Sequence, residues 1–330
     1  MDKSLRIGII DYTPTKYDRV YDAKLSKDVV VGALRRSADT DALIHCRYIR
    51  GLDEDIPKQD FDMFVIMGSI LSPIKPSYEL DRTKAQITEI ISEKPVLGIC
   101  FGFHMIAQLA GNNSKELNEL AIGPTDIRLY EDIEGVGRAG DTVKFPLNQI
   151  YKVTNSNHSL KILAISESGI QIADATEHFG NPVMGFQFHP EFAATDMGWR
   201  AYRNVYEITV DRILSGDYPD FDLEPILKIL STRVLRRLEK QVSIKRLTKS
   251  NITGEQKELL MSPFHDISIS EKRLLGTSES IRTRHEMKQK SQAVISYFFK
   301  KAFMEKRQVK KRPVKPKKVV KKPEQLKLFS

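Results

Sequence analysis

The sequence predicts a doubly wound α/β fold, in which a mostly parallel sheet lies between two layers of helices. Three observations lead to this prediction. Short apolar runs alternate with longer amphipathic segments through the first two hundred residues, the pattern of repeated β-α-β units. One apolar run ends in Gly98-Ile99-Cys100-Phe101-Gly102, directly before a helical segment. After residue 111 the apolar runs become shorter and more polar.

Four apolar runs predict the parallel strands, at residues 6–14, 42–49, 62–69 and 95–100. Each is rich in Ile, Val, Leu or Phe and ends in a turn or a polar residue. Residues 24–38 and 79–94 lie between them and carry apolar side chains at helical spacing. These two segments are expected to cover the sheet.

The more polar runs after residue 111 predict an antiparallel or mixed extension of the sheet. The expected strands are residues 126–130, 149–155, 160–166, 169–176 and 183–192, and a helix over 198–214 is expected to close the domain. Gly and Pro at residues 215–219 mark a boundary.

Three regions follow from this boundary. Residues 1–215 form the α/β domain. Residues 216–305 form a small helical module, because Leu223, Leu227, Leu230 and later apolar residues recur at three- and four-residue spacing and residues 292–304 are again helical in pattern. Residues 306–330 form a Lys-rich tail that is expected to be disordered.

Composition narrows the setting. Two cysteines are too few for a disulfide framework, and the N-terminal apolar run is too short for a signal peptide, which predicts a cytoplasmic protein. No uninterrupted apolar stretch of about 18 residues occurs, so no membrane span is expected. The net charge of +9 belongs to the C-terminus, because residues 301–330 hold ten Lys, two Arg and two Glu and residues 1–300 sum to −1.

Cys100 occupies a strand-to-helix corner that is typical of a hydrolase nucleophile elbow, with a thiol in place of the usual hydroxyl. Flanking glycines permit the tight turn, and the N-terminus of the next helix favours a thiolate and can stabilise an oxyanion. A buried structural cysteine is the alternative interpretation.

A second motif, residues 185–192, supplies the other parts of a nucleophile, base and orienting group. His189 can take the thiol proton, and Glu191 can fix the orientation of the imidazole. The two motifs together favour the catalytic interpretation.

With these motifs, the sequence resembles the class I glutamine amidotransferase-like superfamily over roughly residues 5–215. The resemblance implies a flavodoxin-like mixed sheet with Cys100 as nucleophile, His189 as base and Glu191 as orienting group. It implies a glutamyl thioester formed from the γ-amide of glutamine or of a γ-glutamyl compound, with no metal and no organic cofactor.

The same resemblance suggests further site residues. The oxyanion loop corresponds to Gly68 and Ser69, with the backbone N–H of Phe101 as a second donor. Asn157 and His158 correspond to a loop near the glutamyl carboxylate.

Two departures from the family pattern concern the substrate. His104 stands where glutamine-using members usually have a substrate-binding Gln, and Ala121 replaces the Glu of a typical E-x-G sequence. The γ-glutamyl hydrolase branch tolerates variation at the first position, so a γ-glutamyl substrate and free glutamine both remain open. No synthetase signature is visible, although an amidotransferase could deliver ammonia to a separate synthetase subunit.

The tail provides the alternative function, an altered amidotransferase fold that serves as an interaction protein on DNA. Its lysines could bind phosphates without sequence preference. Its last residues resemble the pentapeptide with which bacterial proteins dock on the sliding clamp, and the matching positions are Gln325, Leu326, Leu328 and Phe329.

Overall fold

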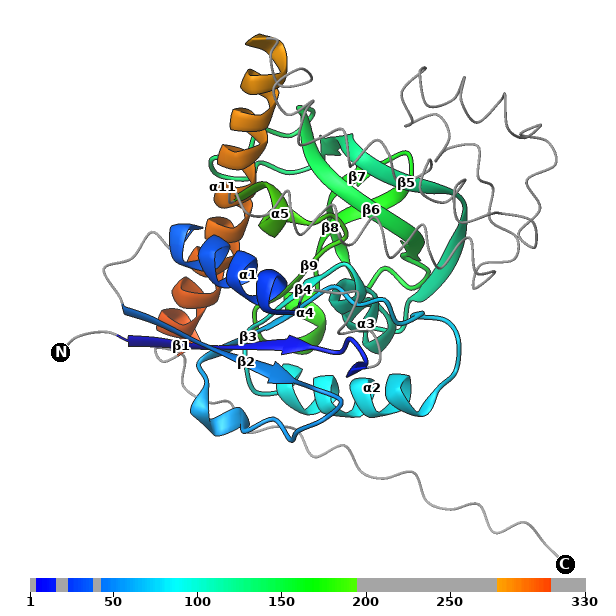
Figure 1. Ribbon diagram of the computed structural model, residues 1–330, viewed down its shortest axis with the longest axis vertical. Coiled ribbons are helices and arrows are strands. Elements are labelled where there is room, and N and C mark those ends of the chain that lie inside the picture. The colour runs from blue at the N-terminus through cyan, green and yellow to red at the C-terminus, as the bar shows by residue number, and fades with distance from the viewer. Residues whose placement is uncertain (1–3, 16–22, 38–42, 195–277, 310–330) are drawn as a thin grey trace, which may run out of the picture.

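The computed structural model describes residues 4–15, 23–37, 43–194 and 278–309. Nine strands form one sheet in the order β2-β1-β3-β4-β9-β8-β7-β5-β6 (Figure 1). The first five strands of that order pair in parallel, and the rest pair antiparallel. This mixed sheet with helices on both faces confirms the predicted fold class.

The parallel half follows the predicted alternation closely. Its elements follow one another along the chain in this order: β1 (Ser4–Asp11), α1 (Ala23–Ser37), β2 (Leu43–Arg50), the short 3-10 turn η2 (Lys58–Asp60), β3 (Met63–Ile66), α2 (Tyr78–Ile91), β4 (Val96–Ile99) and α3 (Phe101–Leu109). Ser77 directly precedes α2, and its side chain accepts a hydrogen bond from the backbone N–H of Leu80 at 3.1 Å. Such N-terminal caps satisfy a backbone donor that the helix leaves free.

The later strands are β5 (Asn113–Leu129), β6 (Thr142–Thr154), β7 (Lys161–Ser166), β8 (Gly169–Asp174) and β9 (Val183–Phe186). β9 joins the two halves of the sheet, since it pairs in parallel with β4 and antiparallel with β8. β5 is much longer than the expected strand over residues 126–130. Its first part is too polar to read as a strand, but it pairs with β6 along most of its length.

Two short helices, α4 (Thr176–Phe179) and α5 (Pro190–Ala194), flank β9. The expected strand over residues 183–192 therefore ends early, at Phe186. Pro190 suits the first position of α5, because proline fixes a helical φ and needs no N–H partner there.

Two hydrophobic cores lie on opposite faces of the sheet. One contains apolar side chains of α2 and α3, including Ile87, Phe103 and Ile106. The other contains side chains of α1 and of the C-terminal helix α11 (Ser278–Val309), including Leu34 and Phe298.

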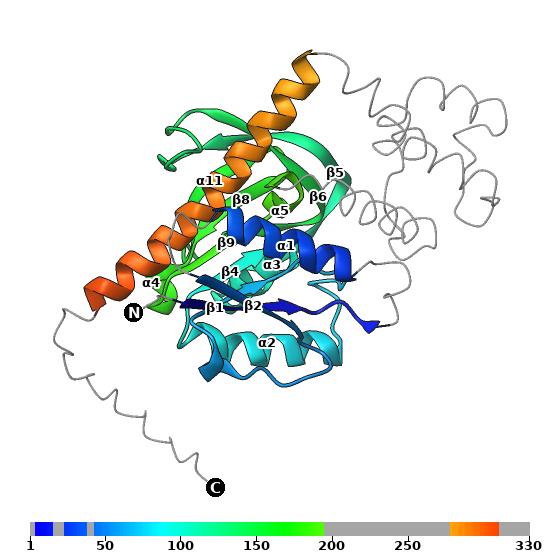
Figure 2. The ribbon, with the colours of Figure 1, turned by 60° about the vertical axis from the view of Figure 1, so that its left-hand side comes forward.

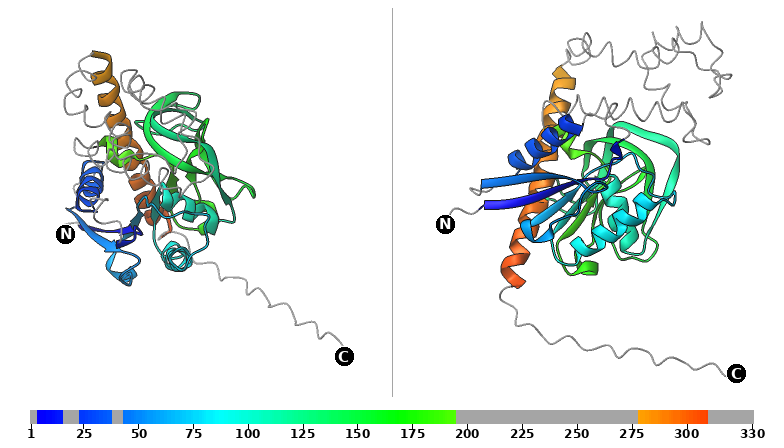
Figure 3. Two further views of the ribbon diagram at one scale, coloured as in Figure 1. Left: turned by 45° about the vertical axis from the view of Figure 1, so that its right-hand side comes forward. Right: turned by 60° about the horizontal axis from the view of Figure 1, so that its bottom comes forward.

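α11 runs beside α1 on one side of the sheet, as Figures 2 and 3 show. Its Lys301 pairs with Asp174 at the end of β8, and its Lys300 pairs with Glu134 at 2.6 Å. The amide of Gln292 donates to the backbone carbonyl of Ala194 in α5 at 3.1 Å. A segment predicted to belong to a separate helical module thus contributes to the core of the α/β domain.

The rest of the predicted C-terminal organisation lies outside the described residues. This applies to the helix over 198–214, to residues 216–277, and to the tail from residue 310, including Gln325, Leu326, Leu328 and Phe329. No helix among the described residues is long and apolar enough to cross a membrane.

Candidate active site

Cys100 lies at the corner between β4 and α3, with backbone angles φ 52° and ψ −104°. A non-glycine residue rarely adopts a positive φ, and such strain is common at functional sites. The backbone N–H of Cys100 donates to the carbonyl of Phe186 in β9 at 2.7 Å, and its carbonyl accepts from the N–H of His104 at 3.1 Å. The corner is therefore held by bonds on both sides.

The two glycines of the motif are required by close packing. A Cβ at Gly98 would lie 2.6 Å from the backbone of Gly102. A Cβ at Gly102 would lie 2.4 Å from the carbonyl oxygen of Ile66 in β3. Only glycine fits at either position, which explains the Gly-x-Cys-x-Gly pattern.

His189 and Glu191 meet directly, with 2.7 Å between Nδ1 of the imidazole and Oε1 of the carboxylate. Both side chains are almost completely buried. Burial lowers the pKa of His189, but the Glu191 carboxylate and the Cys100 side chain, which also hydrogen-bonds the imidazole, outweigh this and raise the pKa to about 10. The structure thus brings Cys100, His189 and Glu191 together.

Two further groups surround the thiol. Nε2 of Gln187 lies 3.8 Å from Sγ, and the backbone carbonyl oxygen of Asn148 in β6 lies 4.0 Å from it. Gln187 is not among the site residues that the sequence motifs predict. Its position two residues before His189 is the signal that could have placed it on the same side of the chain.

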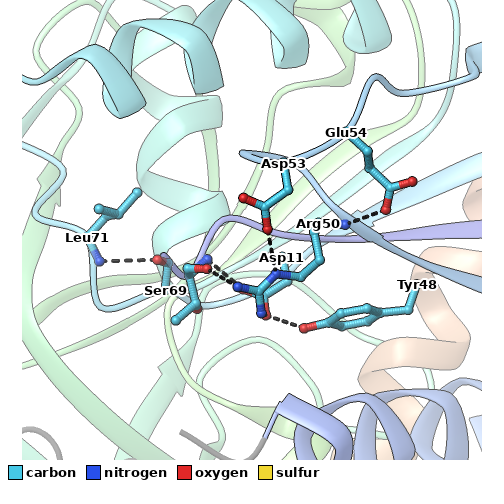
Figure 4. Close-up of polar contacts among 8 residues, drawn as sticks. Asp11, Tyr48, Arg50, Asp53, Glu54, Ser69 and Leu71 are labelled. Atoms are coloured by element: carbon cyan, nitrogen blue, oxygen red, sulfur yellow. Dashed lines mark hydrogen bonds and ion pairs between the residues drawn. The ribbon is translucent and has the colours of Figure 1, made fainter. Parts of the chain in front are cut away.

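Gly68 follows β3 and faces the same site. A Cβ there would lie 2.9 Å from Cε1 of His189 and 3.5 Å from Cβ of Cys100. Ser69 turns its hydroxyl to the next part of the loop and accepts from the N–H of Leu71 at 3.1 Å (Figure 4). Phe101, the first residue of α3, is buried.

A polar cluster forms around the buried Asp11, at the carboxyl ends of the neighbouring strands β1 and β2 (Figure 4). Asp11 accepts from Tyr48 and from the N–H of Thr13, and Arg50 lies 3.8 Å from its carboxylate. Burial raises the pKa of Asp11 despite these partners. The N–H of Met67 donates to the carbonyl of Ile10 at 2.9 Å, so the residue before Gly68 is bonded to β1 next to this cluster.

His104 lies one turn into α3 and is buried. Its Nδ1 lies 2.8 Å from the hydroxyl of Ser114, and its ring meets that of Tyr151 edge to face. Burial lowers the pKa of His104 to about 3, against a smaller opposing effect of a backbone hydrogen bond with Tyr151. The imidazole is therefore neutral, and it links α3 to β5 and β6.

The structure does not bring Asn157 and His158 to the thiol. The Asn157 amide donates to the carbonyl of Ala110 at 2.7 Å, just after the C-terminal end of α3. Cys100 precedes the N-terminal end of this helix and lies roughly 15 Å from Ala110 at 1.5 Å per residue. The side chains of Asn157 and His158 are exposed, and His158 has a positive φ of 57°.

The other cysteine, Cys46, lies on β2. Burial raises its pKa to about 11, with Arg35 opposing. Its environment thus favours the unreactive thiol.

The parallel sheet and its strained cysteine corner define an α/β protein of the nucleophile-elbow kind. Comparison with known sequences identifies the family, because the model of the class-I glutamine amidotransferases matches residues 34–208. The chain belongs to the class-I glutamine amidotransferase family, as its motifs predict.

Relatives of known name agree with this membership. One subunit of the GMP synthase (glutamine-hydrolyzing) from Methanococcoides burtonii is 26% identical over 191 residues, which cover 51% of this chain and 90% of the relative. GMP synthase (glutamine-hydrolyzing) 1 of Bacteroides thetaiotaomicron is 32% identical over 162 residues, 45% of this chain and 29% of that protein.

Among solved structures, a glutamine amido transferase from Methylobacillus flagellatus is similar with a TM-score of 0.52. It is 13% identical, and the match covers 91% of this chain and 95% of that one. This similarity concerns the fold.

Proposed function

We propose that this chain is a cysteine-dependent glutaminase that hydrolyses the γ-amide of glutamine through a thioester on Cys100. The observation that carries the proposal is the assembly of a strained elbow cysteine with a buried pair of His189 and Glu191, whose side chains lie 2.7 Å apart. The names of the relatives, which describe glutamine-hydrolysing synthases, support glutamine as the substrate.

The proposed reaction is an acyl transfer in two steps. The Cys100 thiolate attacks the γ-carbonyl carbon, and the carbonyl oxygen becomes an oxyanion that the N–H groups of the Gly68 loop and of Phe101 stabilise. Protonated His189 gives its proton to the amide nitrogen, the C–N bond breaks and ammonia leaves. His189 then takes a proton from water, which attacks the thioester and releases glutamate and the thiolate.

Glu191 keeps the imidazole oriented through both steps and stabilises its charged form. This role fits the raised pKa of His189, since the reaction begins with a thiolate and a protonated imidazole.

His104 is the residue that bears on the choice between free glutamine and a γ-glutamyl compound as the substrate. In the structure its imidazole contacts Ser114 and Tyr151. We propose that it does not take over the role of a substrate-binding Gln. Weak use of free glutamine by the isolated chain would agree with this proposal, and a γ-glutamyl peptide is the competing substrate.

Glutamate release by the purified full-length chain tests the function, because glutamine and a γ-glutamyl dipeptide both yield glutamate whereas only glutamine yields ammonia. Glutamine and a γ-glutamyl dipeptide are compared, with Cys100→Ser as the inactive variant and Cys46→Ser as the matched control. The expected result is loss of turnover with Cys100→Ser alone. Turnover that survives this substitution would contradict the proposal.

The relative from Methanococcoides burtonii is named as one subunit of a synthase, which also supports a partner. We propose that this chain passes its ammonia to a separate synthetase subunit. Co-purification with such a subunit, followed by glutamine-dependent product formation, would test this pairing.

A second candidate function rests on the tail, which carries a net charge of +10 over residues 301–330 and ends in the clamp-like pentapeptide. In this proposal the tail brings the domain to DNA or to a bacterial sliding clamp. Replacing Leu328 and Phe329 with Ala should abolish binding to a purified clamp while leaving the salt-sensitive DNA contact. If the full chain binds neither partner at low salt, this candidate fails.

A further inference from the structure

Gln187 contacts the sulfur of Cys100 from the same short segment that carries His189. Its Nε2 lies 3.8 Å from Sγ. The two aromatic residues on either side of it, Phe186 and Phe188, stack on each other at 5.6 Å between ring centroids. The segment therefore directs its apolar rings to one side and its polar groups, Gln187 and His189, to the thiol.

The Gln187 side chain is completely buried, and its backbone is fixed by a hydrogen bond from its N–H to the carbonyl of Gln171 at 2.9 Å. Among the described residues, no group binds its Oε1. Nearly all buried polar atoms in proteins have a partner. An unpartnered buried acceptor beside a nucleophile points to a ligand that binds there.

Asn148 and Gln187 both contact the Cys100 sulfur, and they favour different protonation states of it. A neutral thiol can donate its hydrogen to the carbonyl of Asn148, 4.0 Å away. A thiolate has no hydrogen to donate and accepts one from the amide of Gln187 instead. Hydrogen bonds to a charged acceptor are stronger than those between neutral groups, so this contact favours the thiolate.

We propose that Gln187 is a further catalytic residue, whose Nε2–H donates to the Cys100 thiolate and whose Oε1 accepts an N–H of the substrate carboxamide. The inference rests on the proposed function, because it takes Cys100 as the nucleophile. Gln187 gains and loses no proton in the reaction. It holds the sulfur and the amide nitrogen in place while His189 transfers the proton.

The donor contact is tested by the rate at which iodoacetamide alkylates Cys100 in the full chain across pH 5–10, mapped by mass spectrometry. In Gln187→Met, alkylation at neutral pH should slow about tenfold and its pH midpoint should move up by about one unit. Gln187→Glu should move it further, because a carboxylate repels a thiolate.

Gln171→Met is the matched control, since it removes a buried amide from the adjacent strand without touching the sulfur. It should leave the profile unchanged, and Cys46 serves as an internal standard in every sample. Thermal unfolding checks that each variant is folded, and Gln187→Leu, which removes the donor without adding a charge, is measured if Gln187→Met is not folded. Profiles of the Gln187 variants that coincide with the unmodified chain would overturn the donor role.

The carboxamide contact is tested by the protection that glutamine gives Cys100 against alkylation. In Gln187→Met, the glutamine concentration for half protection should rise about tenfold, and the control should not change. Equal protection would overturn this contact. A wild-type chain that glutamine does not protect would contradict the proposed function and the carboxamide contact together, whereas the pH profile would still decide the donor role.

Discussion

Two buried histidines, His104 and His189, have pKa values shifted in opposite directions. His104 has neutral partners, so burial dominates and lowers its pKa to about 3. His189 has the Glu191 carboxylate and the Cys100 side chain beside it, and these raise its pKa to about 10 despite burial. Position in the core alone does not set the charge of an imidazole, because the neighbouring groups decide whether the proton is held.

The raised pKa of His189 predicts how stability depends on pH. The folded chain holds this proton more tightly than the unfolded chain, so the contribution is complete below pH 6.5 and is lost as pH rises through about 10. As pH rises, the free energy of unfolding of His189→Gln should decrease by at least about 1 kcal/mol less than that of the unmodified chain. Urea unfolding of both chains from pH 6 to 10 measures it, and parallel curves would contradict the prediction.

Gly68→Ala is expected to reduce activity far more than stability. The added methyl group would lie 2.9 Å from Cε1 of His189, so the imidazole or the loop must shift. Displacement of an oxyanion donor typically costs about 10²–10³ in rate. Ammonia release and thermal unfolding should be measured together.

Gly140→Ala is the control for this substitution. Its Cβ would meet nothing within 4 Å, although the positive φ of 94° costs some stability. Activity of Gly68→Ala equal to that of this control would show that the loop does not take part in the reaction.

At the scale of elements, α11 covers one face of a sheet whose other face is covered by α2 and α3. Among its described side chains, six apolar ones are buried: Met287, Val294, Ile295, Phe298, Phe299 and Ala302. Lys290 donates to the carbonyl of Val136, and Lys301 pairs with Asp174. The helix is thus fixed by both apolar packing and charged contacts.

Phe298→Ala should destabilise the domain by about 3–5 kcal/mol, because it leaves a cavity at a completely buried site. The expected result is a lower midpoint in urea unfolding with an unchanged slope. Gln289→Ala, on the exposed side of α11, should stay within about 0.5 kcal/mol. Equal stability of the two variants would contradict the assigned packing.

At the scale of the whole molecule, C-terminal truncation should separate α11 from the tail. Removal of residues 310–330 should leave the melting temperature nearly unchanged, since α11 remains complete. Removal of residues 278–330 should expose the apolar face of α1 and β6 and cause aggregation. Thermal unfolding and light scattering check both chains, and a soluble, equally stable shorter chain would contradict this role of α11.

The sequence predicted best what depends on local pattern. The four parallel strands and the family are confirmed, and the predicted elbow cysteine lies at the strained turn between β4 and α3. Three features depend on contacts between distant segments, which local pattern does not show. These are the polar first half of β5, stabilised by pairing with β6, the packing of α11 beside α1, and the attachment of Asn157 to the end of α3.

The path of the chain has a consequence for synthesis on the ribosome. The face that α11 covers is built from segments that end at Ala194, and α11 itself ends at Val309, 115 residues later. At a synthesis rate of about 5–20 residues per second, α11 is complete roughly 6–23 seconds after the other segments of this face. We therefore expect a newly made domain to expose an apolar surface during that interval, and to be a target for chaperones that bind nascent chains.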